Sequence, residues 1–319
     1  MSIVLFFVGF FLLIKGADWL VSGSSSLASK IGVSALIIGL TVVAFGTSAP
    51  ELTVNLLASF NGNTDLAIAN VVGSNIANIL LILGISATIF PLAVQKGTVW
   101  REIPFAILAV IVVSVMASDV IIDNASTSVL SRTEGIVLMS FFAIFLYYIF
   151  SISKKSSDTS ESKNETHQYS NTQSSLMILA GMGGLVLGGK WIVDGAVSFA
   201  TQLGVSEALI GLTIVAVGTS LPELATSAVA AYRKNADIAI GNVVGSNIFN
   251  IFWILGVSAT VAPLPFSEQL GFDLIVMISV TLLLFFALFV GKKHKLKRWQ
   301  GVMFVCLYIL YTIILITRG

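Results

Sequence analysis

The chain is too apolar to be a soluble protein. It has 319 residues, of which 56% are hydrophobic and 10% are charged, and its mean hydropathy is +0.97. Soluble domains carry about 25% charged residues, and a nucleic-acid-binding protein shows a basic face on a soluble fold. The composition therefore excludes both classes, and the formal net charge of +1 indicates no partner.

Long apolar runs follow one another along the chain. In the first half they cover residues 3–13, 35–58, 66–93, 103–117 and 136–152, and a similar series follows residue 175. Because a helical span needs about 20 residues, the runs predict an all-α polytopic membrane protein with about ten transmembrane helices. The first run lacks a basic n-region and a small-residue cleavage site, so we expect a retained helix. The predicted units are 1–152, a linker at 153–175, and 176–319.

The two halves are copies of one unit. Residues 16–88 align with residues 188–260 at a constant offset of 172 without a gap. Within this alignment, segments 32–88 and 204–260 are identical at 35 of 57 positions. A unit of five spans has an odd number of crossings, so the second copy is predicted to be inverted relative to the first.

Lysine and arginine positions predict the orientation in the cell membrane. Cytoplasmic loops carry an excess of these residues. With the N-terminus outside, 13 of the 17 fall in inside loops: Lys30, Lys96, Arg101, Lys154, Lys155, Lys163, Arg233, Lys234, Lys292, Lys293, Lys295, Lys297 and Arg298. Both termini are therefore predicted outside. The linker, rich in Ser, Thr, Asn, Lys and Glu, is predicted to be a mobile cytoplasmic connector, with a regulatory role as the alternative.

One hexapeptide occurs in both halves and places a glutamate deep in an apolar run. The copies read Gly46-Thr47-Ser48-Ala49-Pro50-Glu51 and Gly218-Thr219-Ser220-Leu221-Pro222-Glu223. An ionised carboxylate at membrane depth costs several kcal/mol, so such residues usually mark an ion or substrate path. Matching positions in two repeats predict one site where the repeats meet.

Proline and hydroxyl residues add oxygen ligands to these glutamates. Pro50 and Pro222 lack an N–H, which frees backbone carbonyls around Ala44 and Ala216. Such carbonyls are tolerated at membrane depth where they line a cavity. Further hydroxyls come from Thr47, Ser48, Thr219 and Ser220. This oxygen set suits Ca²⁺ and Na⁺. The alternative is that the prolines only kink their helices and the glutamates are buried neutral acids.

A second duplicated segment supplies serine and asparagine. It reads Gly-Ser-Asn-Ile-x-Asn, with Ser74 and Asn78 in the first half and Ser246 and Asn250 in the second. Each pair is spaced i to i+4 and so shares one helix face, which we expect to border the ion path. We expect the intervening Asn75 and Asn247 to hold neighbouring helices together, and Gly73 and Gly245 to permit close helix approach.

Three other features have structural interpretations. Asp18 and Lys190 occupy equivalent repeat positions near span ends, where we expect pairing or interfacial anchoring. The basic cluster at 292–298 is predicted to face inside and to meet anionic lipid. Cys306, the single cysteine, excludes an intrachain disulfide, and we expect it to be a small core residue.

The two hexapeptides, each followed by Gly/Ala-Asn-Val-Val-Gly-Ser-Asn, resemble the repeats of the sodium/calcium exchanger family, within the calcium:cation antiporters. The resemblance covers nearly the whole chain, and the short linker is similar to compact prokaryotic members. It implies a midplane group of cation sites in which Glu51 and Glu223 are central. The other ligands implied are Thr47, Ser48, Ser74, Asn78, Thr219, Ser220, Ser246, Asn250 and the carbonyls of Ala44 and Ala216.

The chain departs from that family at one position. Many exchangers have aspartate at the place of Asn250, so this pocket has two carboxylates rather than three. Two negative charges balance one Ca²⁺, whereas three Na⁺ leave one positive charge in excess. Proton-coupled relatives usually have Gly-Asn-x-x-Glu where this chain has Gly-Asn-Val-Val-Gly, which disfavours H⁺ coupling.

We therefore expect a secondary antiporter, not an enzyme, that exchanges Na⁺ for Ca²⁺ by alternating access. No cofactor is expected, and the partners are inorganic cations and the lipid bilayer, with the oligomeric state open. The alternatives are a H⁺- or K⁺-coupled antiporter, a passive cation channel, and a structural membrane scaffold. Strict counter-transport distinguishes an antiporter from a channel, and ion binding excludes a scaffold.

Overall fold

The computed structural model describes residues 3–156, 169–202, 216–267, 270–291 and 294–318. In this part of the chain the structure is helical except for two short β-ribbons and the connecting loops. Part of the predicted linker, with Lys163, lies outside the described residues, and so do Lys292, Lys293 and the start of the predicted seventh span. The unit boundaries 1–152, 153–175 and 176–319 stay predictions.

The first half contains long helices broken by short and π-helical segments. Its elements are α1 (Ile3–Ile31), α2 (Ala35–Ile38), η1 (Gly39–Val43), α3 (Ala44–Thr47), α4 (Ala49–Phe60), α5 (Thr64–Ala77), η2 (Asn78–Leu83), α6 (Gly84–Ile89), β1 (Leu92–Ala93), α7 (Lys96–Trp100), α8 (Glu102–Met116), α9 (Asp119–Ile122), β2 (Ser128–Leu130) and α10 (Arg132–Ser156).

The long helices of the second half follow in the same order. The elements of this half are α11 (Asn171–Gln202), α13 (Ala216–Thr219), α14 (Leu221–Tyr232), α15 (Ala236–Ile248), η4 (Phe249–Leu255), α16 (Gly256–Val261), β3 (Leu264–Phe266), α17 (Leu270–Ala287), β4 (Lys295–Leu296) and α18 (Arg298–Arg318).

The apolar helices confirm a polytopic all-α membrane protein. Within the described residues, eight helices are long and apolar enough to cross a membrane. A ninth span is the bent pair formed by Ala35–Thr47 and Ala49–Phe60, with an angle of 46° between them. The matching stretch of the second half, α13 and α14, adjoins residues 203–215, which lie outside the described part. The count of ten therefore stays a prediction.

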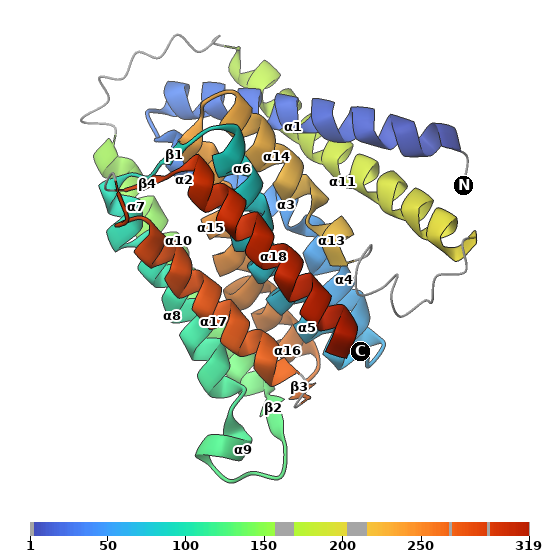
Figure 1. Ribbon diagram of the computed structural model, residues 1–319. Helices are drawn as coiled ribbons and strands as arrows, with labels where there is room; N and C mark the ends of the chain where they lie inside the picture. Colours follow the sequence, from blue (N-terminus) through green and yellow to red (C-terminus); the bar gives the residue numbers. More distant parts are fainter. Residues whose placement is uncertain (1–2, 157–168, 203–215, 268–269, 292–293, 319) are drawn as a thin grey trace.

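The two β-ribbons show that the halves are inverted. β1 and β3 occupy equivalent repeat positions, and β2 and β4 each directly precede the last helix of their half. β1 pairs antiparallel with β4, and β2 pairs antiparallel with β3. Figure 1 places these two ribbons at opposite ends of the molecule. Equivalent strands therefore lie at opposite ends, as an inverted repeat requires.

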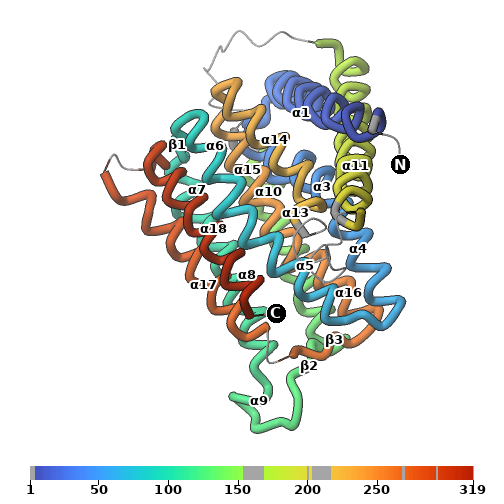
Figure 2. The backbone as a smooth tube through the Cα atoms, turned by 45° about the vertical axis from the view of Figure 1, so that its right-hand side comes forward, coloured from blue at the N-terminus to red at the C-terminus, as the bar shows by residue number. Residues whose placement is uncertain are grey.

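Helices α1 and α11 lie side by side in Figures 1 and 2, and glycines line the contact between them. A Cβ on Gly16 would lie 2.8 Å from the Gly181 carbonyl oxygen, and one on Gly9 would lie 2.9 Å from the Gly188 carbonyl oxygen. Moving along α1 from Gly9 to Gly16, the contact on α11 moves backward from Gly188 to Gly181. The two helices therefore run antiparallel, and only glycine allows this close approach.

The centre of the bundle is formed by the third span of each half. In the most apolar stretch of Ala236–Val261, 94% of the residues are buried, and the value for Thr64–Ile89 is 72%, against 17% for Arg298–Arg318. Gly245 allows α15 to approach the first half, since a Cβ there would lie 2.8 Å from the Leu40 carbonyl oxygen. The same expectation for Gly73 was wrong, because no atom of another described helix lies within 4 Å of a Cβ at that position.

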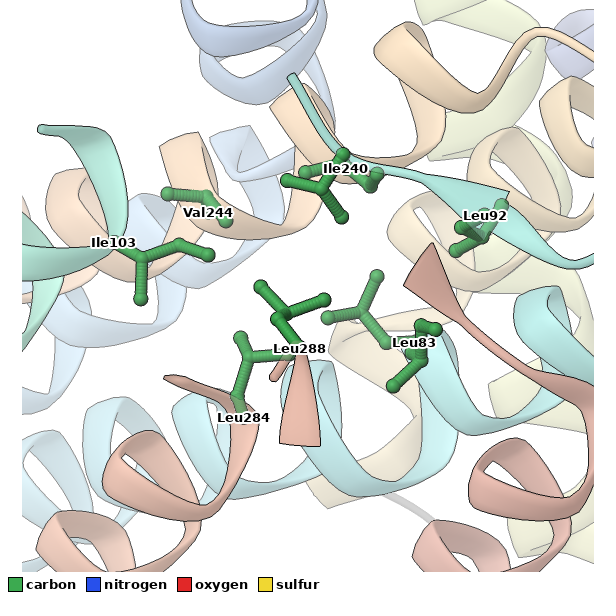
Figure 3. Close-up of a pocket in the computed structure, with 9 residues that line it drawn as sticks. Leu83, Leu92, Ile103, Ile240, Val244, Leu284 and Leu288 are labelled. Carbon is green, nitrogen blue, oxygen red and sulfur yellow. The ribbon is translucent and has the colours of Figure 1, made fainter. Parts of the chain in front are cut away.

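An apolar gap lies below the β1–β4 ribbon (Figure 3). Its volume is about 10 Å³, and the side chains that line it include Leu83, Leu92, Ile103, Ile240 and Leu288. A water molecule needs polar partners as well as this much space. The gap is therefore a packing defect rather than an ion site.

Cys306 corrects one expectation about the core. The residue is exposed on α18, whereas Gly301 and Phe304 on the same helix are buried. Two residues along a helix correspond to about 200° of rotation, so the face that buries Phe304 turns Cys306 outward.

Candidate cation-binding site

A proline-containing hinge interrupts the second span of each half in the same way. α3 ends at Thr47, Ser48 has φ −83° and ψ 7°, and α4 begins at Ala49. In the second half Ser220, with φ −87° and ψ 6°, separates α13 from α14. The following proline has no N–H for the carbonyl four residues earlier, which breaks the helix at this point.

Each hinge places its glutamate in the first turn of a new helix. Glu51 lies in the first turn of α4 and Glu223 in the first turn of α14, and each is only 1% exposed. The positive end of the helix dipole favours negative charge at this position. The hinge therefore explains how the sequence holds two carboxylates inside the bundle.

Serines of one half bond to the glutamate of the other half. Ser48 Oγ donates to Glu223 Oε1 at 2.9 Å, and Ser220 Oγ donates to Glu51 Oε1 at 3.2 Å. Ser220 Oγ also lies 3.3 Å from Ser74 Oγ, and Ser246 Oγ lies 3.5 Å from Glu223 Oε1. The two glutamates, the hinge serines and the serines of α5 and α15 thus form one polar centre.

Four asparagines join α5 and η2 to α15 and η4 beside this centre. Asn75 Nδ2 donates to the Asn247 carbonyl and Asn247 Nδ2 to the Asn75 carbonyl, both at 3.3 Å. Asn78 Nδ2 donates to Asn247 Oδ1 at 2.9 Å, and Asn250 Nδ2 donates to Asn75 Oδ1 at 3.0 Å. The expectation that Asn75 and Asn247 hold helices together is confirmed.

Four buried acceptor oxygens of the centre have no hydrogen-bond donor within the described part of the chain: Glu51 Oε2, Glu223 Oε2, Asn78 Oδ1 and Asn250 Oδ1. They form two pairs of equivalent atoms. Asn78 and Asn250 lie in the π-helical segments η2 and η4, a helix irregularity that is frequent at functional sites. An unpaired buried acceptor costs free energy, and a cation bound here would satisfy it.

The hinge threonines make contacts that the sequence did not predict. Thr47 Oγ1 donates to Asn242 Oδ1 at 2.9 Å, and Thr219 Oγ1 lies 3.4 Å from Asn70 Oδ1. The sequence held a signal for these asparagines. Asn70, Ser74 and Asn78 are spaced i, i+4 and i+8, so the polar helix face predicted for Ser74 and Asn78 extends one turn earlier to Asn70.

The two alanines of the predicted ligand set lie on the hinge helices. Ala44 is buried, and its carbonyl accepts the Ser48 N–H at 3.0 Å and lies 3.3 Å from Thr47 Oγ1. Ala216 is the first residue of α13. In this conformation the Ala44 carbonyl is therefore hydrogen-bonded rather than open, and its role as a ligand stays a prediction.

Two further buried carboxyl groups were not predicted from the sequence. Glu102 is 2% exposed and accepts a hydrogen bond from Tyr148, and Asp273 is 4% exposed and bonds to Tyr311 and Arg318. Both lie in the first turn of their helices, α8 and α17. The bonds to Tyr148, Tyr311 and Arg318 connect neighbouring helices, while Glu102 Oε2 has no hydrogen-bond donor among the described residues.

Residues 1–151 and 174–317 match the family described as sodium/calcium exchanger protein. The chain belongs to the sodium/calcium exchanger family. This exchanger is 38% identical to the putative antiporter CaxA of Alkalimonas amylolytica, over 97% of this chain and 96% of that protein. It is 33% identical to the sodium/calcium exchanger MaX1 of Methanosarcina acetivorans, over 98% of both. A solved structure of the sodium-calcium exchanger NCX_Mj, soaked with Na⁺ and Sr²⁺, superposes with a TM-score of 0.83 at 36% identity, over 98% of both chains.

Proposed function

We propose that this exchanger is a secondary antiporter that moves Na⁺ and Ca²⁺ in opposite directions across the cell membrane. Glu51 and Glu223 are its central ligands. The observation that carries the proposal is the set of four buried oxygens without donors among the described residues, two from carboxylates and two from amides. Hard cations prefer such oxygens, and the names of the relatives MaX1 and NCX_Mj agree with this choice.

The charge of the centre supports competition between the two ions. Two ionised glutamates balance one Ca²⁺, so Na⁺ must leave the shared oxygens before Ca²⁺ binds. The hydroxyls of Thr47, Ser48, Ser74, Thr219, Ser220 and Ser246 complete the proposed ligand set, with the Ala44 and Ala216 carbonyls as further ligands in the course of transport. Because binding of one ion excludes the other, the Na⁺ gradient drives Ca²⁺ the opposite way.

The inverted repeat supports alternating access. When the two halves exchange conformations, the same centre opens to the other face of the membrane. α1 and α11, which cross through glycines, are the helices that move over the centre. We place both termini outside and the linker in the cytoplasm, because this orientation puts the lysine and arginine excess inside.

A flux assay tests the proposal. The protein is reconstituted into liposomes loaded with Na⁺, and ⁴⁵Ca²⁺ uptake is measured after dilution into Na⁺-free buffer. We expect uptake that depends on the Na⁺ gradient. Uptake that ignores Na⁺ and follows a pH gradient, or that requires K⁺, overturns Na⁺ coupling.

The same vesicles separate antiport from a channel. In an antiporter, no net Ca²⁺ flux occurs unless a second cation moves, so vesicles without internal Na⁺ must stay empty of ⁴⁵Ca²⁺. Uptake driven by membrane potential alone would identify a passive channel.

A further inference from the structure

Asn242 makes a complete set of hydrogen bonds next to the cation centre. The residue lies on α15 and is fully buried. Its Oδ1 accepts from Thr47 Oγ1 at 2.9 Å, and its Nδ2 donates to Ser227 Oγ at 2.9 Å and to the Glu223 carbonyl at 3.3 Å. An amide has two N–H groups and one carbonyl, so these three partners fix its orientation.

The fixed amide determines where the Thr47 hydroxyl hydrogen points. A hydroxyl has one hydrogen and two lone pairs. Among the described residues, the other acceptors within hydrogen-bond distance of Thr47 Oγ1 are the carbonyls of Val43 at 3.1 Å and Ala44 at 3.3 Å, both farther than Asn242 Oδ1. When Asn242 Oδ1 takes the hydrogen, the lone pairs of Thr47 Oγ1 are left for a cation.

Asn70, the equivalent residue of the first half, also contacts the hinge threonine of the opposite half, at a longer distance. Asn70 Oδ1 lies 3.4 Å from Thr219 Oγ1, and Asn70 Nδ2 donates to Asn55 Oδ1 at 2.6 Å. Asn55 in turn donates to the Ala67 carbonyl at 2.9 Å. Each asparagine therefore connects the hinge threonine of the opposite half to a side chain on the helix that carries its own half's glutamate.

We propose that Asn242 and Asn70 are positioning residues for the transported cations. Each directs a hinge threonine hydroxyl so that its oxygen accepts the ion, and Asn242 is the stronger of the two. The inference rests on the proposed function, because it needs Thr47 and Thr219 to contact the ion. Groups that orient metal ligands in this way typically change metal affinity about 10- to 100-fold when they are removed.

A double-mutant cycle separates positioning from a purely structural role. The variants are Asn242→Ala, Thr47→Val and the double variant, with Thr53→Ala as a control on the exposed face of α4. Each is purified and reconstituted, and KM and maximal rate for Ca²⁺ and Na⁺ are measured with the thermal unfolding midpoint. A structural role lowers the midpoint and the amount of active protein but leaves KM unchanged.

We expect Asn242→Ala to raise KM for at least one of the two cations about 10- to 100-fold. Thr47→Val is expected to raise it by a similar factor, and the double variant to be no worse than Thr47→Val. Losses that multiply in the double variant, or an unchanged KM in Asn242→Ala, overturn the inference.

A second cycle keeps the test decisive where Asn242→Ala does not fold. Asn70→Ala and Thr219→Val probe the looser connection, for which we expect the same lack of additivity with a smaller rise in KM. Direct ⁴⁵Ca²⁺ binding to the wild-type protein separates this inference from the proposed function. Wild-type protein that binds no Ca²⁺ overturns the function, whereas wild-type binding that Asn242→Ala and Asn70→Ala leave unchanged overturns only the positioning role.

Discussion

The centre of this exchanger obeys the symmetry of its repeats, whereas the outer contacts of α1 do not. In the centre most hydrogen bonds come in equivalent pairs, as in Ser48 to Glu223 and Ser220 to Glu51. At the C-terminal end of α14, Arg233 pairs with Asp18 of α1 and also bonds to Ser22. The equivalents of Asp18 and Arg233 are Lys190 and Asn61, which cannot form such an ion pair.

The symmetric centre and the asymmetric contact of α1 have different roles. Under the proposed function, the centre receives the same ions from both faces and needs the same ligands in both states, which explains why symmetry is kept there. An ion pair that has no counterpart in the other half is expected to favour one conformation over its mirror state. The expected pairing is thus confirmed for Asp18, with Arg233 as its partner, and stays a prediction for Lys190. We infer that the Asp18–Arg233 pair sets which face the free protein prefers.

The largest expected effect breaks the symmetric centre. Glu51→Gln and Glu223→Gln should each abolish exchange, with a loss of about 100-fold or more, because a buried Ca²⁺ would lose one of its two carboxylate partners, and removing one partner of a buried ion pair costs about 3–5 kcal/mol. Exchange is measured as Na⁺-driven ⁴⁵Ca²⁺ uptake, and elution as a single folded species provides the control. Full activity in either variant would mean that the two glutamates are not one site.

The second effect concerns the asparagine contacts of α5 and α15. Asn75→Ala and Asn247→Ala should each lower the free energy of unfolding by about 1–3 kcal/mol, because each leaves buried amide groups without partners. Thermal unfolding in detergent measures the loss, and Thr53→Ala on an exposed face serves as the control. Markedly unequal losses in the two asparagine variants would show that the symmetry does not extend to this contact.

The third effect sharpens the asymmetric region. Arg233→Gln should change the ratio of the Ca²⁺ KM values at the two faces by up to about 5-fold, since a pair whose side chains are 40% and 33% exposed contributes about 1 kcal/mol or less. The two values are measured in right-side-out and inside-out vesicles. Asn61→Asp, which supplies Lys190 with a partner in the mirror state, should shift the ratio in the same direction. A ratio that neither variant changes would show that the ion pair does not bias the two states.

The smallest effect is expected at Cys306. Cys306→Ser should change stability by less than about 0.5 kcal/mol and leave exchange intact, because the side chain is exposed on α18. Thermal unfolding and ⁴⁵Ca²⁺ uptake measure both properties. A loss above about 1 kcal/mol would place the cysteine at a packed interface instead.

Much of the fold followed from sequence because its causes are local. Apolar runs and the prolines Pro50 and Pro222 act within one span, and the offset of 172 shows that the second half copies the first. Together they predicted the membrane class, the inversion and the loss of a backbone hydrogen bond at each proline. The contacts that close the centre join residues about 170 positions apart. No local spacing encodes which hydroxyl of one half meets which carboxylate of the other.

The residues that the sequence analysis missed also depend on contacts between distant parts of the chain. Asn70 and Asn242 lie on the polar helix faces predicted for α5 and α15, but their partners Thr219 and Thr47 come from the other half. The π-helical segments η2 and η4 carry no breaker residue at Asn78 or Asn250 and depend on tertiary packing. Glu102 lies at the edge of an apolar run, and its burial depends on Tyr148, 46 positions later in the chain.

The most direct test of a single shared centre is equilibrium ⁴⁵Ca²⁺ binding to the purified protein at increasing Na⁺. We predict saturable binding that Na⁺ displaces in the wild-type protein, and no binding in Glu51→Gln or in Glu223→Gln. Binding that Na⁺ does not displace, or that persists in both variants, would contradict one centre shared by the two ions.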